Sequence, residues 1–175
     1  YENVALAGFQ YRAFCQQKRQ FPAFITNTRI YSTILIWNKI PYRWRGRYNE
    51  DTDLSLRALK DGWATIQFYA FTQYKPVTMT MKGGNTDELY QGDGRRLMAE
   101  SLAEQHPDIA KTTKKYGRWQ HHVDYSGFSR NKLKRRNIEI SKGVNNYGMV
   151  LQTADGSALP SNAAGELQPP PNNQK

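Results

Sequence analysis

The stretch from 49 to 62 constrains the fold most, because it has every mark of one helix with defined ends. Asn49 can cap its start, and Asp61-Gly62 predicts its end. Acids gather in its first turn, where the helix dipole favours anions: Glu50, Asp51 and Asp53. An apolar stripe along it predicts one buried face: Leu54, Ala58 and Leu59.

Runs of β-branched and aromatic residues on both sides of this helix predict strands. They are 4–14, 24–30, 31–37, 64–71, 119–125 and 147–152. A second helix is expected from about Thr86 or Asp93 to Glu104, with Leu97, Leu102 and Ala103 inward, and a short third helix over 108–115. Helices and strands in this order predict a mixed α/β layer structure.

Composition narrows the classes further. A single cysteine, Cys15, excludes an intramolecular disulfide and favours an intracellular setting. No run of about 18 apolar residues is present, so no membrane partner is expected. The ordered region is predicted as one unit over 1–153, and the Pro- and Asn-rich stretch 154–175 as a disordered tail. Because the opening residues read as the middle of a domain, we expect a fragment.

The net charge of +10 is concentrated in one region. Residues 111–136 hold nine Lys or Arg against one acid, Asp124. Such a stripe indicates binding to a polyanion such as nucleic acid. The alternative is a basic surface that only contacts solvent. With Tyr125 and Phe128 nearby, it could combine phosphate contacts with base stacking. The candidate nucleic-acid-binding residues are Lys114, Lys115, Arg118, Arg130, Lys132, Lys134, Arg135 and Arg136.

The segment 41–53 contains the highest density of charged residues that could bind a substrate or take part in catalysis. Arg43, Arg45 and Arg47 alternate, so an extended backbone would place them on one side as they approach the acidic helix start. Arginines beside carboxylates suit a site that holds a phosphorylated substrate while an acid accepts a hydroxyl proton. In the alternative reading, the acids serve only the helix dipole and pair with the arginines.

Two weaker motifs follow. His121 and His122 would point to opposite faces of a strand, and Asp124 would share the face of His122 and could help it bind a metal or phosphate. The turn 82–87 could present backbone amides to a phosphate before a helix.

At residues 45–54, Arg-Gly-Arg-Tyr-Asn-Glu-Asp-Thr-Asp-Leu, followed by 56–62, the sequence resembles the TET/JBP-associated glycosyltransferases of phages and some eukaryotes, relatives of the base J glucosyltransferase. Other stretches that are similar to this family occur in the expected order, at 8–11, 27–32, 82–86 and 117–125. The likeness extends over about 1–135.

The resemblance implies part of a GT-A-like fold, its acceptor and catalytic half, without the nucleotide-binding half and its Asp-x-Asp motif. An isolated fragment without that half would be inactive. The resemblance also implies Asp51 as the catalytic base, with Glu50 second, and a Mg²⁺ or Mn²⁺ ion beside a UDP-sugar donor. His122 is the preferred metal ligand and His121 the other candidate. The implied substrate-binding residues are Trp44, Arg45, Arg47, Asn49, Asp53, Gly83, Gly84 and Asn85.

The expected reaction is transfer of a hexose from the nucleotide-sugar to the hydroxyl of a 5-hydroxymethylpyrimidine in DNA, beside a TET-type oxygenase. It would take place in bacterial or phage-infected cytoplasm, or in the nucleus of a eukaryote. Two alternatives stay open: a non-catalytic nucleic-acid-binding module, and a glycosyltransferase with a protein acceptor.

Overall fold

A computed structural model describes residues 1–15, 22–31, 33–75 and 92–136. The chain divides into a unit of residues 1–134 and a second unit of residues 135–175, and all elements named below belong to the first. The expected turn at 82–87, strand at 147–152 and tail at 154–175 lie outside the described residues. Within the described ranges, no helix is long and apolar enough to cross a membrane.

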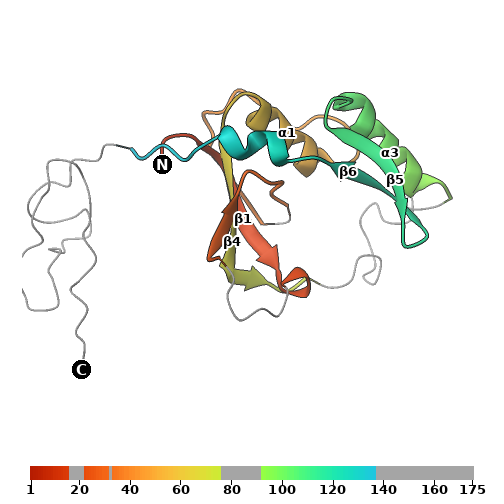
Figure 1. The fold of residues 1–175 in the computed structure, drawn as a ribbon, viewed down its shortest axis with the longest axis horizontal. Helices are drawn as coiled ribbons and strands as arrows, with labels where there is room; N and C mark the ends of the chain where they lie inside the picture. The colour runs from red at the N-terminus through yellow and green to blue at the C-terminus, as the bar shows by residue number, and fades with distance from the viewer. Residues whose placement is uncertain (16–21, 32, 76–91, 137–175) are drawn as a thin grey trace, which may run out of the picture. The chain divides into compact units, whose positions relative to one another are not determined.

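The predicted mixed α/β architecture is confirmed, and its main layer is a four-stranded sheet (Figure 1). Its strands are β1 (Val4–Tyr11), β2 (Phe24–Thr26), β3 (Ile34–Ile36) and β4 (Ala64–Gln73), in the order β2-β4-β1-β3. The central pair β1–β4 is parallel, whereas β3 and β2 flank it antiparallel. A short 3₁₀ turn, η1 (Arg12–Phe14), ends β1.

The edge strands β2 and β3 are much shorter than the predicted runs 24–30 and 31–37. At Asn27 the backbone turns into the left-handed region, with φ 59, which stops β2 after three residues. Beside β3, Gly8 leaves no room for a side chain, because a Cβ there would lie 2.3 Å from the carbonyl oxygen of Thr33. Glycine is therefore required where β1 meets Ile30 and Thr33.

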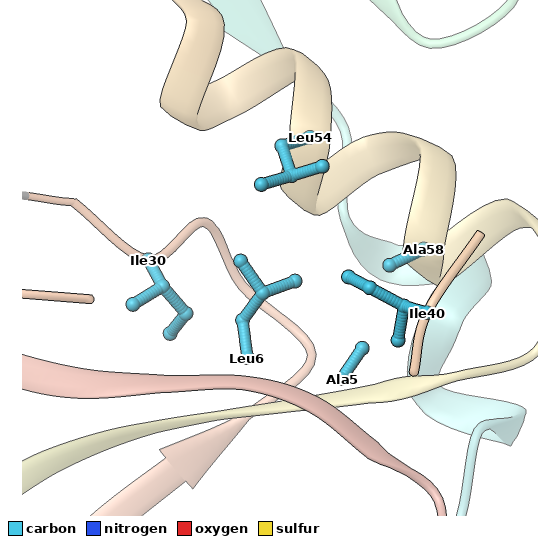
Figure 2. Packing of buried hydrophobic residues seen from close by; sticks show 6 residues of the cluster. All are labelled: Ala5, Leu6, Ile30, Ile40, Leu54 and Ala58. Carbon is cyan, nitrogen blue, oxygen red and sulfur yellow. The ribbon is translucent and has the colours of Figure 1, made fainter. Parts of the chain in front are cut away.

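Helix α1 (Glu50–Lys60) connects β3 to β4 and is buried on two sides. Leu54 and Ala58, one turn apart, pack on the sheet against Ala5, Leu6, Ile30 and Ile40 (Figure 2). Leu56 and Leu59 lie on another face of the helix and join a second cluster. A helix with two apolar faces belongs inside the fold, so its first turn is held rigidly.

The second cluster joins α1 to helix α3 (Gly94–Gln105) and a β-hairpin. Leu102 of α3 meets Leu56 and Leu59, together with Ala110 and Phe128. The hairpin consists of β5 (Ala110–Lys115) and β6 (Arg118–Val123), followed by the 3₁₀ turn η2 (Ser126–Arg130) (Figure 1).

Two expectations for this region are wrong. Residues 110–115 form the strand β5 rather than a helix, because Thr112 and Thr113 fit an extended ladder and pair with His121 and Gln120. In α3, Leu97 is 49% exposed, and the inward positions are Ala99 and Leu102.

Candidate functional site

The first turn of α1 points its three acids into three different environments. Glu50 is exposed, Asp51 is half-buried, and the side chain of Asp53 is fully buried. Asn49 precedes them with φ 53 and makes no capping bond; its amide nitrogen instead donates to the carbonyl oxygen of Met98, 2.7 Å away. The helix start was predicted correctly, but Asn49 ties α1 to α3 rather than capping it.

Asp51 shares its surroundings with residues from distant parts of the chain. Its Oδ1 accepts hydrogen bonds from the backbone nitrogen of Thr52, at 2.6 Å, and from the Thr52 hydroxyl, at 3.2 Å. Its negative charge acts on His121 of β6 and on Tyr125, which precedes η2. Arg29, in the loop after β2, acts on the same two side chains. We call Arg29, Asp51, His121 and Tyr125 the α1 cluster.

His121 is neutral at physiological pH. Burial lowers the pKa of its imidazole to about 4, the charge of Arg29 acts in the same direction, and Asp51 opposes them. The guanidinium of Arg29 lies 3.4 Å from Nε2 of His121. A neutral imidazole has one acceptor nitrogen, so Arg29 donates to Nε2 and the ring proton is on Nδ1. Arg29 also lies over the ring of Tyr31, at 4.6 Å from its centroid.

The other member of the histidine pair lies outside this cluster. His122 is exposed on the opposite face of β6, as strand alternation requires. Asp124 lies beyond the end of β6, where its Oδ1 accepts from the backbone nitrogen of Ser126 at 2.9 Å. The preference for His122 with Asp124 therefore gives way to His121.

The side chains of the α1 cluster could not supply a complete coordination shell for a metal ion. Nε2 of His121 already accepts from a guanidinium, which would repel a cation at that nitrogen. In the part of the chain that the structure describes, no three His, Cys, Asp or Glu side chains gather closely enough to hold an ion. The metal predicted at His121 and His122 is therefore not supported by these side chains.

Asp53 is the centre of a separate, buried ion-pair network. Arg45 donates to both its oxygens at 2.8–3.1 Å, Arg57 lies 3.0 Å from Oδ2, and Nε2 of His106 donates to Oδ1 at 2.8 Å. Burial alone would raise the pKa of Asp53, but hydrogen bonds from His106 and Arg45, with the charge of Arg57, outweigh it and lower the pKa below its usual range.

This network changes the role predicted for Asp53. Its side chain is 0% exposed, so it cannot touch a substrate. Instead it fixes Arg45, and with it the loop before α1, against the helix and the end of α3. Asp53 is a positioning residue, and the alternative reading of pairing between acids and arginines holds for this one carboxylate.

The other predicted substrate residues lie along the same loop. Arg45 is half-exposed despite its bond to Asp53, Arg47 is exposed, and Trp44 is 50% exposed. Trp44 borders a small cavity of about 240 Å³ with Trp37, Tyr42, Arg43 and Leu54 among its walls. Gly83, Gly84 and Asn85 lie outside the described residues.

The predicted basic residues are all exposed and fall into two groups. Lys114, Lys115 and Arg118 surround the turn of the β5–β6 hairpin, whereas Arg130 and Lys132 lie at and after η2. Lys134 ends the first unit, and Arg135 and Arg136 open the second.

An open groove of about 740 Å³ adjoins the α1 cluster. Its walls are residues 26–28 on one side and 125–133 on the other, rich in hydroxyl and amide groups. Asparagines hold these walls together: the side-chain nitrogen of Asn27 donates to the carbonyls of Phe128 and Asn131, both at 2.9 Å. Tyr125 borders the groove and also feels the charge of Asp51, so it connects the two features.

The lowered pKa of His121 predicts a specific loss of stability in acid. The unfolded chain takes up a proton on this imidazole near pH 6.5, whereas the folded chain resists protonation down to about pH 4. The folded state therefore loses stability as the pH falls through this window, by about 1–2 kcal/mol between pH 7 and pH 5. Urea unfolding at both pH values measures it, and His121→Gln should lack this component; an unchanged pH dependence in that variant would refute the assignment.

Residues 1–84 match the family described as TET-Associated Glycosyltransferase. No curated protein and no solved structure matches the chain. The match is shorter than the expected likeness over 1–135, but it contains α1 with Glu50 and Asp51, and also Arg29. Within the α1 cluster, His121 and Tyr125 lie outside the matched residues.

Proposed function

We propose, from the premise that residues 1–84 are a TET-associated glycosyltransferase segment, that this chain transfers a hexose from a nucleotide-sugar to the hydroxymethyl group of a 5-hydroxymethylpyrimidine in DNA. The family supports a transferase whose substrate is connected with DNA modification. The identity of the sugar, the hydroxylated base as acceptor and a GT-A-type fold are proposed in addition to this family-level function.

The observation that carries the proposal is the position of Asp51. It is half-buried at the start of a helix that packs on two faces, and its charge acts on a neutral histidine that Arg29 also contacts. Oδ1 is oriented by two hydrogen bonds from Thr52, so the carboxylate has a fixed direction and Oδ2 can accept from an incoming hydroxyl. A general base needs this combination of fixed geometry and partial access.

Asp51 would act as the base on the acceptor. The hydroxymethyl proton passes to the carboxylate as the hydroxyl oxygen bonds to the anomeric carbon of the donor, and the bond from that carbon to the diphosphate breaks. Assistance of this kind contributes about 10²–10⁴-fold to a rate. Glu50, exposed on the preceding position, is the second candidate.

The departing diphosphate carries negative charge, which arginines can stabilise. Arg29 supplies a guanidinium inside the α1 cluster, and half-exposed Arg45 and exposed Arg47 lie on the loop that leads to α1. A Mg²⁺ or Mn²⁺ ion would supply further charge stabilisation in a GT-A-type enzyme, but the side chains of the described residues do not form a coordination shell for it.

The acceptor strand would be held by exposed basic residues of the first unit, which are Lys114 on the hairpin and Arg130, Lys132 and Lys134 at and after η2. A base inside a duplex must leave the stack to reach a carboxylate, and phosphate contacts on both sides would hold the strand meanwhile.

Nucleotide release from UDP-hexoses separates this function from the two alternatives. The chain should release UDP faster in the presence of hydroxymethylated DNA than with the same DNA carrying methyl groups. Release that neither DNA stimulates would favour a protein acceptor, and no release with any donor, in the presence of Mg²⁺ or Mn²⁺, would favour a binding module.

A further inference from the structure

We propose that Trp119 and Lys114, on the β5–β6 hairpin, form a platform on which a base of a single DNA strand stacks while its phosphate contacts the lysine. The proposal rests on the proposed function only in taking the bound strand to be the acceptor. The stacking surface itself follows from the hairpin.

Strand pairing places this platform on the same face as the α1 cluster. In the antiparallel ladder, Ala110 pairs with Val123, Thr112 with His121, and Lys114 with Trp119. These alternate positions share one face of the hairpin. At its inner end, Ala110 and Val123 pack with Leu102 of α3 in the second cluster. In the middle, Nε2 of His121 lies 3.4 Å from Arg29, and the charge of Asp51 acts on its imidazole. Trp119 and Lys114 form its outer end.

The spacing suits a base held close to the reacting group. Trp119 and His121 are two residues apart on one strand, a separation of about 7 Å between their backbone positions. A base stacked on Trp119 would therefore lie within about one nucleotide of the α1 cluster. Arg29, 3.4 Å from Nε2 of His121, lies beside the middle of the same face.

The side chains at the outer end have the chemistry that single strands require. The indole of Trp119 is 38% exposed, and the ammonium of Lys114 lies over its ring, 5.6 Å from the centroid. A base that stacks on the indole would displace this ammonium from the ring, and the lysine would then reach the phosphate of the same nucleotide. Aromatic stacking beside a cation is the common mode of binding unpaired bases without sequence preference. The hairpin, residues 110–123, carries no acid.

The hairpin turn keeps this surface rigid and also supplies a matched control. Tyr116 and Gly117 have φ 52 and 72, the pattern of a tight type I′ turn whose twist matches the flanking strands. Lys115, next to Lys114 in sequence, pairs with Arg118 on the opposite face. Lys115→Ala removes one positive charge, as Lys114→Ala does, but from the face of the hairpin that lies opposite Trp119.

Fluorescence anisotropy with a labelled, unmodified single-stranded oligonucleotide tests the platform on the full chain. Trp119→Ala should weaken binding by about 5- to 100-fold, and Trp119→Phe should restore most of it because a ring remains. Lys114→Ala should reduce the slope of log affinity against log salt by about 0.7, whereas Lys115→Ala should leave it nearly unchanged. Circular dichroism confirms that each variant is folded.

Four results would overturn the proposal. Three come from the oligonucleotide assay: wild-type affinity for Trp119→Ala, equal losses for the alanine and phenylalanine variants, and equal effects of the two lysine variants. The fourth is an equal loss by Trp119→Ala of binding to phosphatidylserine vesicles, since it would indicate a membrane contact. Because no sugar donor or hydroxymethyl group is present, these results are independent of sugar transfer, whose failure is seen only in the UDP-release assay.

Discussion

Replacing Asp51 by Asn is expected to lower the rate of sugar transfer by about 10²–10⁴-fold and leave the chain folded. The amide keeps the size of the carboxylate, and its oxygen can still accept from the backbone nitrogen of Thr52. What it loses is the ability to take a proton from the acceptor hydroxyl. The measurement is single-turnover transfer with saturating donor and hydroxymethylated DNA, so that a change in affinity does not enter the rate.

Glu50→Gln is the matched control for Asp51→Asn. It removes one negative charge from the adjacent position of the same helix turn, where the side chain is exposed. We expect it to change the rate by less than about tenfold, because an exposed carboxylate contributes mainly a screened charge. The reverse order of effects would make Glu50 the base, and an unchanged rate in both variants would remove this helix turn from the chemistry.

Replacing Asp53 by Asn should destabilise the fold by about 3–5 kcal/mol, the usual cost of removing one partner from a buried ion pair. The change would leave Arg57 and buried His106 without the negative charge that they surround. It would also release Arg45 and loosen the loop before α1. Thermal and urea unfolding measure the loss.

Asp108→Asn provides the control for that measurement. Asp108 pairs with Lys60 at 2.7 Å, but both side chains are substantially exposed, so the variant should cost less than about 1 kcal/mol. Similar stability of the two variants would mean that the Asp53 network contributes no more than a surface pair. Asp53 would then have to be reconsidered as a residue that reaches the substrate.

The sequence predicted best where one local signal sufficed. The ends of α1 followed from its acids and from Asp61-Gly62, and β1 and β4 from long β-branched and aromatic runs. It failed where tertiary contacts override propensity. Asn49 uses its amide to hold α3, and residues 110–115 extend because β6 pairs with them.

The candidate site was predicted only in part, for a similar reason. Asp51 could be chosen from its helix position, and His121 was one of two adjacent histidines. Only the packing of the β5–β6 hairpin decides which histidine is turned inward, where the charge of Asp51 acts on it. Arg29 was missed as a site residue, and Tyr125 was expected only as a stacking surface beside the basic stripe. They lie 22 residues before and 74 residues after Asp51, and no spacing rule connects them to it. The stretch 27–32, already similar to the family, was the one signal for Arg29.

The burial of Asp53 was equally hidden. Acids two residues apart in a first helix turn have the same sequence signature, yet Asp51 is half-buried beside His121 and Asp53 is enclosed by three basic side chains. A local pattern identifies acids at a helix start, but the partners Arg57 and His106 decide which one is structural.

Transfer of a radiolabelled hexose to two oligonucleotides tests the central claim most directly. One carries a single 5-hydroxymethylpyrimidine, and the other carries the 5-methyl base in the same sequence. The α1 cluster predicts label on the hydroxymethylated strand alone, and its loss with Asp51→Asn. Equal label on both strands, or label that persists in the Asp51 variant, would contradict the assignment of this helix turn as a glycosyl-transfer site.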